Sequence, residues 1–416
     1  MKHTLTAILL AFHSVALFPQ VILTIEGEVI NDTETGISNG YNIPRSQVTT
    51  LTFRNNTMTS VNSRGYILQA GDEAPGLNNN HLNGAVITGN RFTWNGTDAD
   101  SWTHALFTGY NLGVIIKYNY LKDTPNGIQR KSNGMTDQTG VIAYNIINNP
   151  KVGIVVKGMN GVKIYNNTLY CERTTAQTGR GLIDVHANTD NELNAPSVGT
   201  KIYNNIFYTK YETFCINVMD EASLLGFESD YNVFYSESGT PKFSAGGSVK
   251  TFEEWKALGY DTHSIIINPG FNNFTDFVPA QRLNYGTNLG DLFKEGLATD
   301  AIFGSVSPKT ANQNDTWQVG ARIYAGGVSI EEPIESVTKI YPNPVYGSFY
   351  VVNNDTNSTY HTMKVYDMTG NIVMNRTIES GLNPITVPLY FTSGLYTIAL
   401  ENNSPDRYVR KLLIIN

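Results

Sequence analysis

The sequence has little charge and almost no cysteine. Charged residues make up 16% of the 416 residues, against roughly a quarter in an average soluble domain. The two cysteines, Cys171 and Cys215, are too few for a disulfide scaffold and lack metal-ligand spacing, so we expect buried thiols, with a single bridge as the alternative. A net charge of −7 gives no general attraction for polyanions. We therefore expect no nucleic-acid partner, and any acidic ligand needs a local basic site.

Long hydrophobic runs are absent beyond the N-terminus. Lys2 and His3 precede an apolar stretch, Leu5 to Phe18, that has the length and polarity of a secretory signal peptide and is too short to span a membrane. We expect a signal peptide over residues 1–20, with processing near Gln20. No later run reaches transmembrane length, so no transmembrane segment is expected.

The composition otherwise favours strands and turns. Hydrophobic residues reach 41%, enough to bury a core, and glycine, asparagine, threonine and tyrosine are plentiful. The sequence therefore predicts an all-β protein. Its length suits two domains, or one elongated repeat body with an appendage.

One short pattern returns seven times: an apolar residue, two variable residues, asparagine, one variable residue and an apolar residue. Two instances match imperfectly. The spacings between successive asparagines are 34, 29, 26, 22, 38 and 27. The repeated residues are Asn56, Asn90, Asn119, Asn145, Asn167, Asn205 and Asn232.

Such spacings suit coils of three short strands and three turns, which predicts a parallel β-helix over residues 21–326. We expect asparagine at the corner because it tolerates the left-handed conformation and its amide bonds the next coil. Leucine-rich repeats and a β-propeller fit less well, since their consensus motifs are missing. Residues 40 to 325 resemble the right-handed parallel β-helix superfamily that contains pectate lyases. Thr251 and Glu254 form a capping-box pattern for a short helix that would cover the open end of the stack.

The C-terminal part forms a separate domain after a polar, proline-containing linker, 327–336. Residues 337–416 alternate apolar and polar positions in short strands, which predicts a small β-sandwich. The motifs Tyr341-Pro-Asn-Pro344, Val365-Tyr-Asp-Met-Thr-Gly370 and Ser393-Gly-Leu-Tyr396 resemble the type IX secretion system sorting domain. The resemblance implies a bacterium of the Bacteroidetes kind, the type IX secretion machinery as a partner, and a secreted or cell-surface location. A generic sandwich or a carbohydrate-binding module is the alternative.

The candidate site lies on strands that follow the asparagine corners. Three segments align on Gly127, Gly153 and Gly181, which would stack Ile128, Ile154 and Leu182 inward. This alignment places Lys131 and Lys157 at the same position on successive coils, with backbones about 4.8 Å apart. Like charges held this close disfavour the protonated state, so one lysine is expected to act as a general base.

This arrangement suits β-elimination in a uronic-acid polymer, where a cation neutralises the C5 carboxylate, a base removes the C5 proton and an acid assists the C4 oxygen. Arg130-Lys131-Ser132 resembles the site of the alginate lyase and chondroitinase B family, which implies Lys131 as the base and Arg130 or Lys157 as the assisting cation. A bound Ca²⁺ would help neutralise the substrate, although no loop matches a calcium motif and no metal-ligating residue is assigned.

The longest spacing, between Asn167 and Asn205, predicts a binding loop beside the lysine pair. Within it, His186 is a candidate proton donor. The candidate substrate-binding residues are Arg180, Asp184 and Gln129.

Several alternatives stay open. The lysines can be solvated surface groups, and the recurring Tyr144, Tyr165 and Tyr203 are more often packing than a sugar-stacking ladder. A glycoside hydrolase would need paired carboxylates, for which Asp137, Asp184 and Asp220 are available. A non-catalytic surface glycan-binding protein or adhesin needs only a groove. The expected function is a secreted, monomeric polysaccharide lyase acting on an acidic polysaccharide.

Overall fold

The computed structural model divides the chain into two compact units, Met1–Gly326 and Gly327–Asn416. The expected signal peptide and linker lie outside the described residues. The structure describes residues 22–32, 37–38, 41–43, 50–61, 64–71, 84–96, 103–173, 179–190, 194–304, 306–313, 316–325, 338–353, 362–378, 381–386, 391–401 and 407–414.

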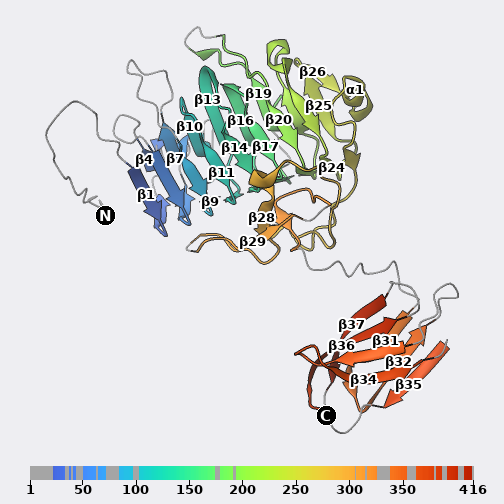
Figure 1. Cartoon of the computed structure of the whole chain (residues 1–416). Helices are drawn as coiled ribbons and strands as arrows, with labels where there is room; N and C mark the ends of the chain where they lie inside the picture. Colours follow the sequence, from blue (N-terminus) through green and yellow to red (C-terminus); the bar gives the residue numbers. More distant parts are fainter. Residues whose placement is uncertain are drawn as a thin grey trace. The chain divides into compact units, whose positions relative to one another are not determined.

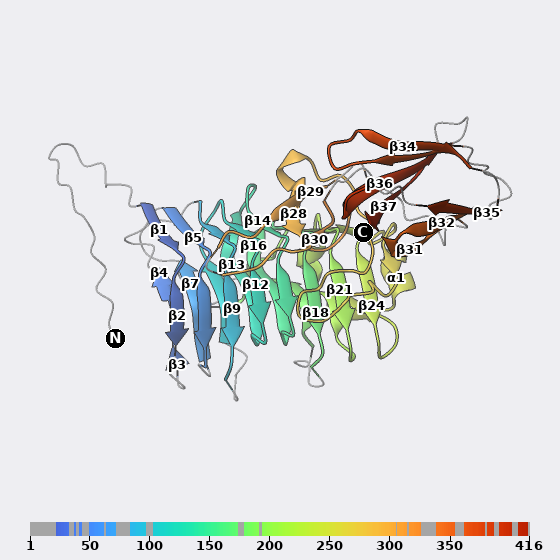
Figure 2. The ribbon, with the colours of Figure 1, turned by 90° about the horizontal axis from the view of Figure 1, so that it is seen from below.

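The first unit is a parallel β-helix, as predicted, in which three long sheets stack coil upon coil (Figures 1 and 2). We name them sheets A, B and C. Each coil contributes one strand to A, then one to B, then one to C, and nearly all neighbours pair in parallel.

Sheet A contains β1 (Ile22–Glu26), β5 (Thr50–Arg54), β8 (Val86–Thr88), β11 (Ile115–Lys117), β14 (Val141–Ala143), β17 (Lys163–Tyr165), β20 (Lys201–Tyr203) and β23 (Glu228–Asp230). Sheet B contains β2 (Val29–Asp32), β6 (Thr57–Ser60), β9 (Arg91–Trp94), β12 (Tyr120–Lys122), β15 (Ile146–Asn148), β18 (Thr168–Cys171), β21 (Ile206–Thr209), β24 (Val233–Ser236) and β27 (Ile265–Ile266).

Sheet C contains β3 (Ile37–Ser38), β4 (Tyr41–Ile43), β7 (Arg64–Gly71), β10 (Thr103–Gly109), β13 (Asn126–Thr136), β16 (Val152–Asn160), β19 (Gly181–His186), β22 (Phe214–Val218), β25 (Lys242–Ala245) and β26 (Ser248–Lys250). Only β26 runs antiparallel to its neighbour in this sheet.

The seven repeated asparagines form the expected ladder at the corner between sheets A and B. From Asn90 onward, each side-chain oxygen accepts the backbone N–H and the side-chain amide of the preceding ladder residue, as when Asn145 accepts from Asn119 at 3.0 and 2.9 Å. All seven are fully buried. Asn232 ends the ladder by donating its amide to the buried Asp261 at 2.8 Å.

The conformational reason given for these asparagines was wrong. The left-handed conformation belongs to the residue before each ladder asparagine, for example Tyr118 (φ 61°), Tyr144 (φ 55°) and Asn204 (φ 57°). That residue makes the turn, while the asparagine that follows turns its amide inward. Amide bonding, and not tolerance of positive φ, therefore explains the repeat.

A capped apolar core fills the stack. The inward-facing residues form one continuous cluster that also contains Cys171, and both cysteines are free and buried, as expected. Helix α1 (Phe252–Ala257) closes the C-terminal end with Phe252 and Trp255, and its capping box between Thr251 and Glu254 is confirmed. No helix in the described ranges is long and apolar enough to cross a bilayer.

The chain after the last coil returns along the outside of the stack. Residues 265–325, which include η3 (Asp291–Phe293), β28 (Glu295–Ala298), β29 (Thr310–Asn312) and β30 (Arg322–Ile323), pack on sheets A and B. Tyr144 and Tyr165 are buried beneath this segment, with Tyr165 against Phe293. Tyr144 and Tyr165 therefore serve packing. Among the described residues, the returning segment packs on sheets A and B, and sheet C is the sheet on which it does not pack.

The second unit is a small sandwich with its own core. Its strands are β31 (Thr338–Tyr346), β32 (Ser348–Asn353), β33 (Thr362–Tyr366), β34 (Ile372–Thr377), β35 (Gly381–Thr386), β36 (Gly394–Glu401) and β37 (Arg407–Ile414). Strand β31 pairs first with β32 and then, at Val345, with β37. The register shift lies at Pro342 and Pro344, because proline has no N–H to donate to a ladder.

Candidate functional site

Strands β13, β16 and β19 lie side by side in sheet C (Figure 1), and they carry a row of ionisable residues in register. Lys131 pairs in register with Lys157, as predicted, and Lys157 pairs with His186. We call these three residues the lysine row. Neighbouring strands are about 4.8 Å apart, so the three side chains project from adjacent coils.

The register of β19 differs from the one expected when Gly127, Gly153 and Gly181 are aligned. Ile154 pairs with Ile183 and not with Leu182, so β19 is shifted by one residue. The physical reason is a close approach of backbones: a Cβ on Gly127 would lie 2.3 Å from the Gly153 carbonyl oxygen, and one on Gly153 would lie 2.4 Å from that of Leu182. Gly181 is not the equivalent residue, and the shift brings His186 into the row.

A single carboxylate bridges the two lysines. Lys131 Nζ lies 2.9 Å from Asp190 Oδ2, and Lys157 Nζ lies 2.7 Å from Asp190 Oδ1. The lysine side chains are only 8% and 13% exposed, whereas that of Asp190 is 31% exposed. The pair is thus already a carboxylate-binding site, and its ligand comes from the protein itself.

Asp190 is positioned by Asn188, whose side chain bonds β13. Asn188 pairs with Ala195 in an antiparallel bridge, and its side chain donates to the Ser132 carbonyl at 2.7 Å. The same side chain accepts the Asp190 N–H at 3.1 Å. Partial burial would raise the pKa of Asp190, but hydrogen bonds from Lys157 and Lys131 outweigh it and hold the pKa below its usual value. Asp190 is therefore ionised at neutral pH.

His186 is a neutral imidazole. Burial, helped by the nearby charges of Arg180 and Lys157, lowers its pKa to about 4. Its Nδ1 lies 2.8 Å from the Ala187 carbonyl oxygen, which can only accept, so Nδ1 carries the proton. Nε2 is then a bare acceptor, and it is buried without a partner among the described residues. This tautomer favours an acceptor role over the proton-donor role expected from the sequence.

Arg180 stands on the same face as the row, anchored by Asp184. The Arg180 Nε donates to Asp184 Oδ2, and the fully buried Asp184 also accepts from the Gly181 N–H at 2.8 Å and the Asn217 amide at 2.9 Å. Burial raises the pKa of Asp184 against these contacts. Asp184 therefore orients a partly exposed guanidinium and does not itself face a ligand.

Arg130 does not belong to the site, which corrects its expected catalytic role. It pairs in register with the core residue Val156, its side chain is 2% exposed, and its guanidinium lies 2.6 Å from Asp137. It also donates to Thr108 and Asn111 at 3.1 Å each. The signal was available in the sequence, because Ile128 faces inward and alternation turns Arg130 inward too.

Gln129 faces outward two residues before Lys131. It is 8% exposed and pairs in register with Phe107 and Val155. Its place on the same strand face as Lys131 is consistent with its expected substrate contact, which stays a prediction.

The carboxylates considered for a hydrolase serve other purposes. Asp137 accepts the Gly113 and Gly140 N–H groups at 2.9 and 2.8 Å besides its contact with Arg130. Asp220 accepts the Ser223 and Ala187 N–H groups at 2.9 and 2.7 Å, at the start of η2 (Glu221–Leu224). Since each is used to hold turns, no pair of free catalytic carboxylates emerges from the three.

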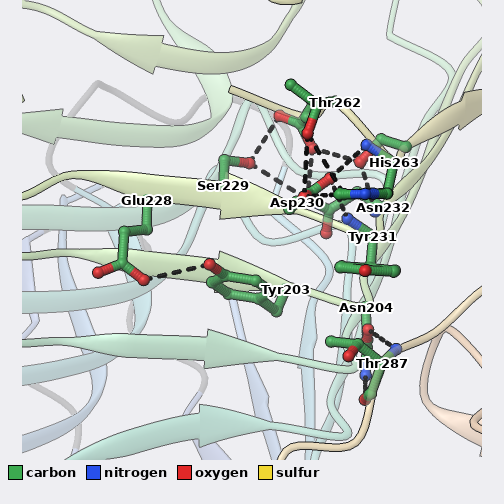
Figure 3. Close-up of polar contacts among 12 residues, drawn as sticks. Tyr203, Asn204, Glu228, Ser229, Asp230, Tyr231, Asn232, Thr262, His263 and Thr287 are labelled. Atoms are coloured by element: carbon green, nitrogen blue, oxygen red, sulfur yellow. Dashed lines mark hydrogen bonds and ion pairs between the residues drawn. The ribbon is translucent and has the colours of Figure 1, made fainter. Parts of the chain in front are cut away.

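A second polar cluster lies at the end of sheet A (Figure 3). Asp230 Oδ2 lies 2.6 Å from His263 Nδ1, and Asp230 Oδ1 accepts the His263 N–H at 2.7 Å. The imidazole stacks on Tyr231 with centroids 4.7 Å apart. Beside it, the Tyr203 hydroxyl donates to Glu228 at 3.1 Å. The contacts of His263 with Asp230 hold the last coil to β23. The regular spacing of the coils in the sequence could have predicted that these segments meet.

A cavity of about 310 Å³ opens near the last strands of sheet C, lined by Glu212, Lys242 and Lys250 among others. Lys242 begins β25, in register with Phe214 at the start of β22. The lining of the cavity includes no member of the lysine row, and His186 lies at the far end of β19 from Gly181, which pairs with Phe214, so the cavity is a separate feature. Among the described residues no group of three or more histidines, cysteines or acids is placed to hold a metal ion, and we derive no step through Ca²⁺.

Comparison with known proteins identifies the second unit. Residues 339–416 match the family of secretion system C-terminal sorting domains. The sandwich and its motifs agree with this match, so the expected sorting domain is confirmed, and the protein is secreted or displayed at the cell surface.

The search of curated proteins gives a weaker match. The chain is 26% identical over 115 residues to an endo-acting ulvan lyase of Formosa agariphila, which is 27% of this chain and 22% of that protein. The chain thus spans about a fifth of the relative's length, and the match is shorter than the β-helix unit. No solved structure matches. The chain is a parallel β-helix that carries a secretion system C-terminal sorting domain.

Proposed function

We propose that the protein is a polysaccharide lyase that cleaves an acidic, uronate-containing polysaccharide by β-elimination at the lysine row. The observation that carries this proposal is the Asp190 carboxylate held between Lys131 and Lys157. A uronate presents the same group to a protein. Two ammonium groups on adjacent coils are a preorganised receptor for it.

The chemistry divides between the two lysines. Lys157 binds and neutralises the C5 carboxylate, which makes the C5 proton more acidic, and Lys131, once it has released its own ammonium proton to solvent, takes the C5 proton as a neutral amine. A double bond then forms between C4 and C5 as the bond from C4 to the bridging oxygen breaks. Arg180, with its Nε fixed on Asp184, is placed to hold a second acidic group of the polymer.

His186 contributes as a hydrogen-bond acceptor in this scheme. Its unprotonated Nε2 suits a sugar hydroxyl, whereas the leaving oxygen needs a donor. In this scheme the leaving oxygen takes its proton from water, because the nearby Tyr110, which accepts from Asn188 at 3.4 Å, is only 1% exposed. The relative is itself named a lyase, which supports the reaction class without fixing this chain's substrate.

The test is a screen of alginate, pectate, glycosaminoglycans and ulvan with the purified protein. Elimination yields an unsaturated, ultraviolet-absorbing product. Hydrolysis yields only new reducing ends, and a non-catalytic binder yields neither. Lys131→Ala should lower product formation by about 10² to 10⁴-fold, the usual contribution of a general base.

A matched control is Lys201→Ala on sheet A, because Lys201 also pairs with a carboxylate, Glu228, at 2.7 Å. This control should keep wild-type activity. Retained activity in a folded Lys131→Ala variant would remove Lys131 from the mechanism.

A further inference from the structure

We propose that Asp190 is an internal substitute for the substrate: it occupies the carboxylate position of the lysine row in the free protein and gives way to a uronate carboxylate on binding. The inference rests on the proposed function and deepens it. It assigns Asp190 as a residue that sets affinity and selectivity, and it defines the group recognised as a carboxylate that bridges two coils.

The geometry of the contact supports this assignment. Each oxygen of Asp190 takes one lysine, at 2.9 and 2.7 Å, so the carboxylate bridges β13 and β16 along the axis of the stack. A carboxylate on a polymer lying across these strands would need the same two ammonium groups. Because both lysines are almost covered, it reaches them fully only where Asp190 now lies.

Asp190 is suited to exchange and not to permanent burial. Its side chain is 31% exposed, and among the described contacts its carboxylate has no partner besides the two lysines. The buried carboxylates of this unit differ. Asp261 receives four side-chain hydrogen bonds, from Ser229, Asn232, Trp255 and Ser264, and Asp137 receives backbone N–H groups.

The charge balance also fits exchange. With Asp190 in place, the two lysines and the aspartate carry a net charge of one positive unit. Replacing one carboxylate by another preserves that balance, whereas a neutral sugar would leave two facing ammonium groups without a counter-charge. Asp190 therefore raises selectivity for acidic polymers at the expense of affinity.

The experiment compares Asp190→Asn and Asp190→Ala with the wild-type full-length protein. Affinity electrophoresis in gels that contain alginate, polygalacturonate or neutral dextran measures binding from the retardation of the protein. Removal of the internal competitor should tighten binding to an acidic polymer about five- to tenfold, as expected for release from partly exposed ion pairs. Dextran binding should not change. Asp190→Asn, which loses the charge but keeps the shape, should fall between the wild type and Asp190→Ala.

The control variant is Glu228→Gln, which removes a carboxylate from a lysine on sheet A and should leave binding unchanged. Thermal unfolding checks that the Asp190 variants stay folded. Weaker or unchanged binding to all acidic polymers in folded variants overturns the proposal.

Kinetics give a second readout. A lower KM with unchanged kcat supports exchange, and a lower kcat with unchanged KM overturns it by making Asp190 part of the catalytic step. Failure of the proposed function is distinguishable, because it is the absence of unsaturated product while tighter binding by the variants persists.

Discussion

The asparagine ladder and the lysine row repeat one side chain on successive coils, yet they behave in opposite ways. The ladder runs through seven coils, and each side-chain amide bonds the next at 2.9 to 3.1 Å. In the lysine row, lysine repeats on two coils only, and the third coil supplies His186 as a neutral imidazole. An amide both donates and accepts, so it can bond its own copy, whereas an ammonium group only donates.

We therefore expect the asparagine ladder to stabilise the fold and the lysine row to bind a ligand. A self-complementary side chain satisfies itself and stabilises the stack. A row of identical donors needs an acceptor from elsewhere, and here Asp190 supplies it. If this difference holds, substitutions in the ladder should lower the unfolding free energy, and substitutions of the lysines should weaken binding.

Arg130 should have the largest effect on stability, although it is adjacent to Lys131 in sequence. Arg130→Met would leave Asp137 as a buried carboxylate without its ion-pair partner, which destabilises proteins by about 3 to 5 kcal/mol. Urea denaturation measures the change. Lys131→Met is the matched comparison and should change the unfolding free energy by less than about 1 kcal/mol. Equal unfolding free energies of the two variants would show that Arg130 stabilises the fold no more than Lys131 does.

The middle of the ladder should come next. Asn145→Ala removes the oxygen that accepts from the Asn119 backbone and amide, and we expect a loss of about 2 to 3 kcal/mol in unfolding free energy. The exposed Asn284 is the control, and its replacement by alanine should have little effect. If urea midpoints of the two variants coincide, the ladder does not stabilise the stack.

His186 predicts a pH dependence. Its pKa is about 4 in the folded protein because of burial, and about 6.5 in an unfolded chain. Between these values the unfolded chain binds the proton and the folded chain does not. The contribution is therefore complete above about pH 6.5 and is lost as pH falls toward 4, by up to about 3 kcal/mol. Urea midpoints should fall more steeply with acid in the wild type than in His186→Gln, and parallel curves would contradict this.

Lys157 should have the smallest effect on stability and a clear one on binding. Lys157→Met breaks a partly exposed contact with Asp190, so the unfolding free energy should change by less than about 1 kcal/mol. Retardation in alginate or polygalacturonate gels should weaken at the same time. A large loss of stability would show that the row is structural, like the ladder.

Particular residues show what the sequence could predict. The ladder and the match of Lys131 with Lys157 follow from repeats visible in the chain, because the step from glycine to lysine is the same on both coils. His186 was placed one residue away, since the alignment on Gly181 matches Ile154 with Leu182, whereas the strands pair Ile154 with Ile183. The contact of Asp190 with the two lysines could not be predicted from the sequence, because it depends on the antiparallel bridge between Asn188 and Ala195.

The most direct test of the central claim measures initial rates of unsaturated product formation on the best acidic polymer. Wild type, Lys131→Ala, Lys157→Ala and Lys201→Ala should be compared at equal folded concentration. We expect unsaturated product from the wild type, rates at least about a hundredfold lower for Lys131→Ala and Lys157→Ala, and a wild-type rate for Lys201→Ala. Wild-type rates in both sheet C variants, or no unsaturated product from any acidic polymer, would contradict the account.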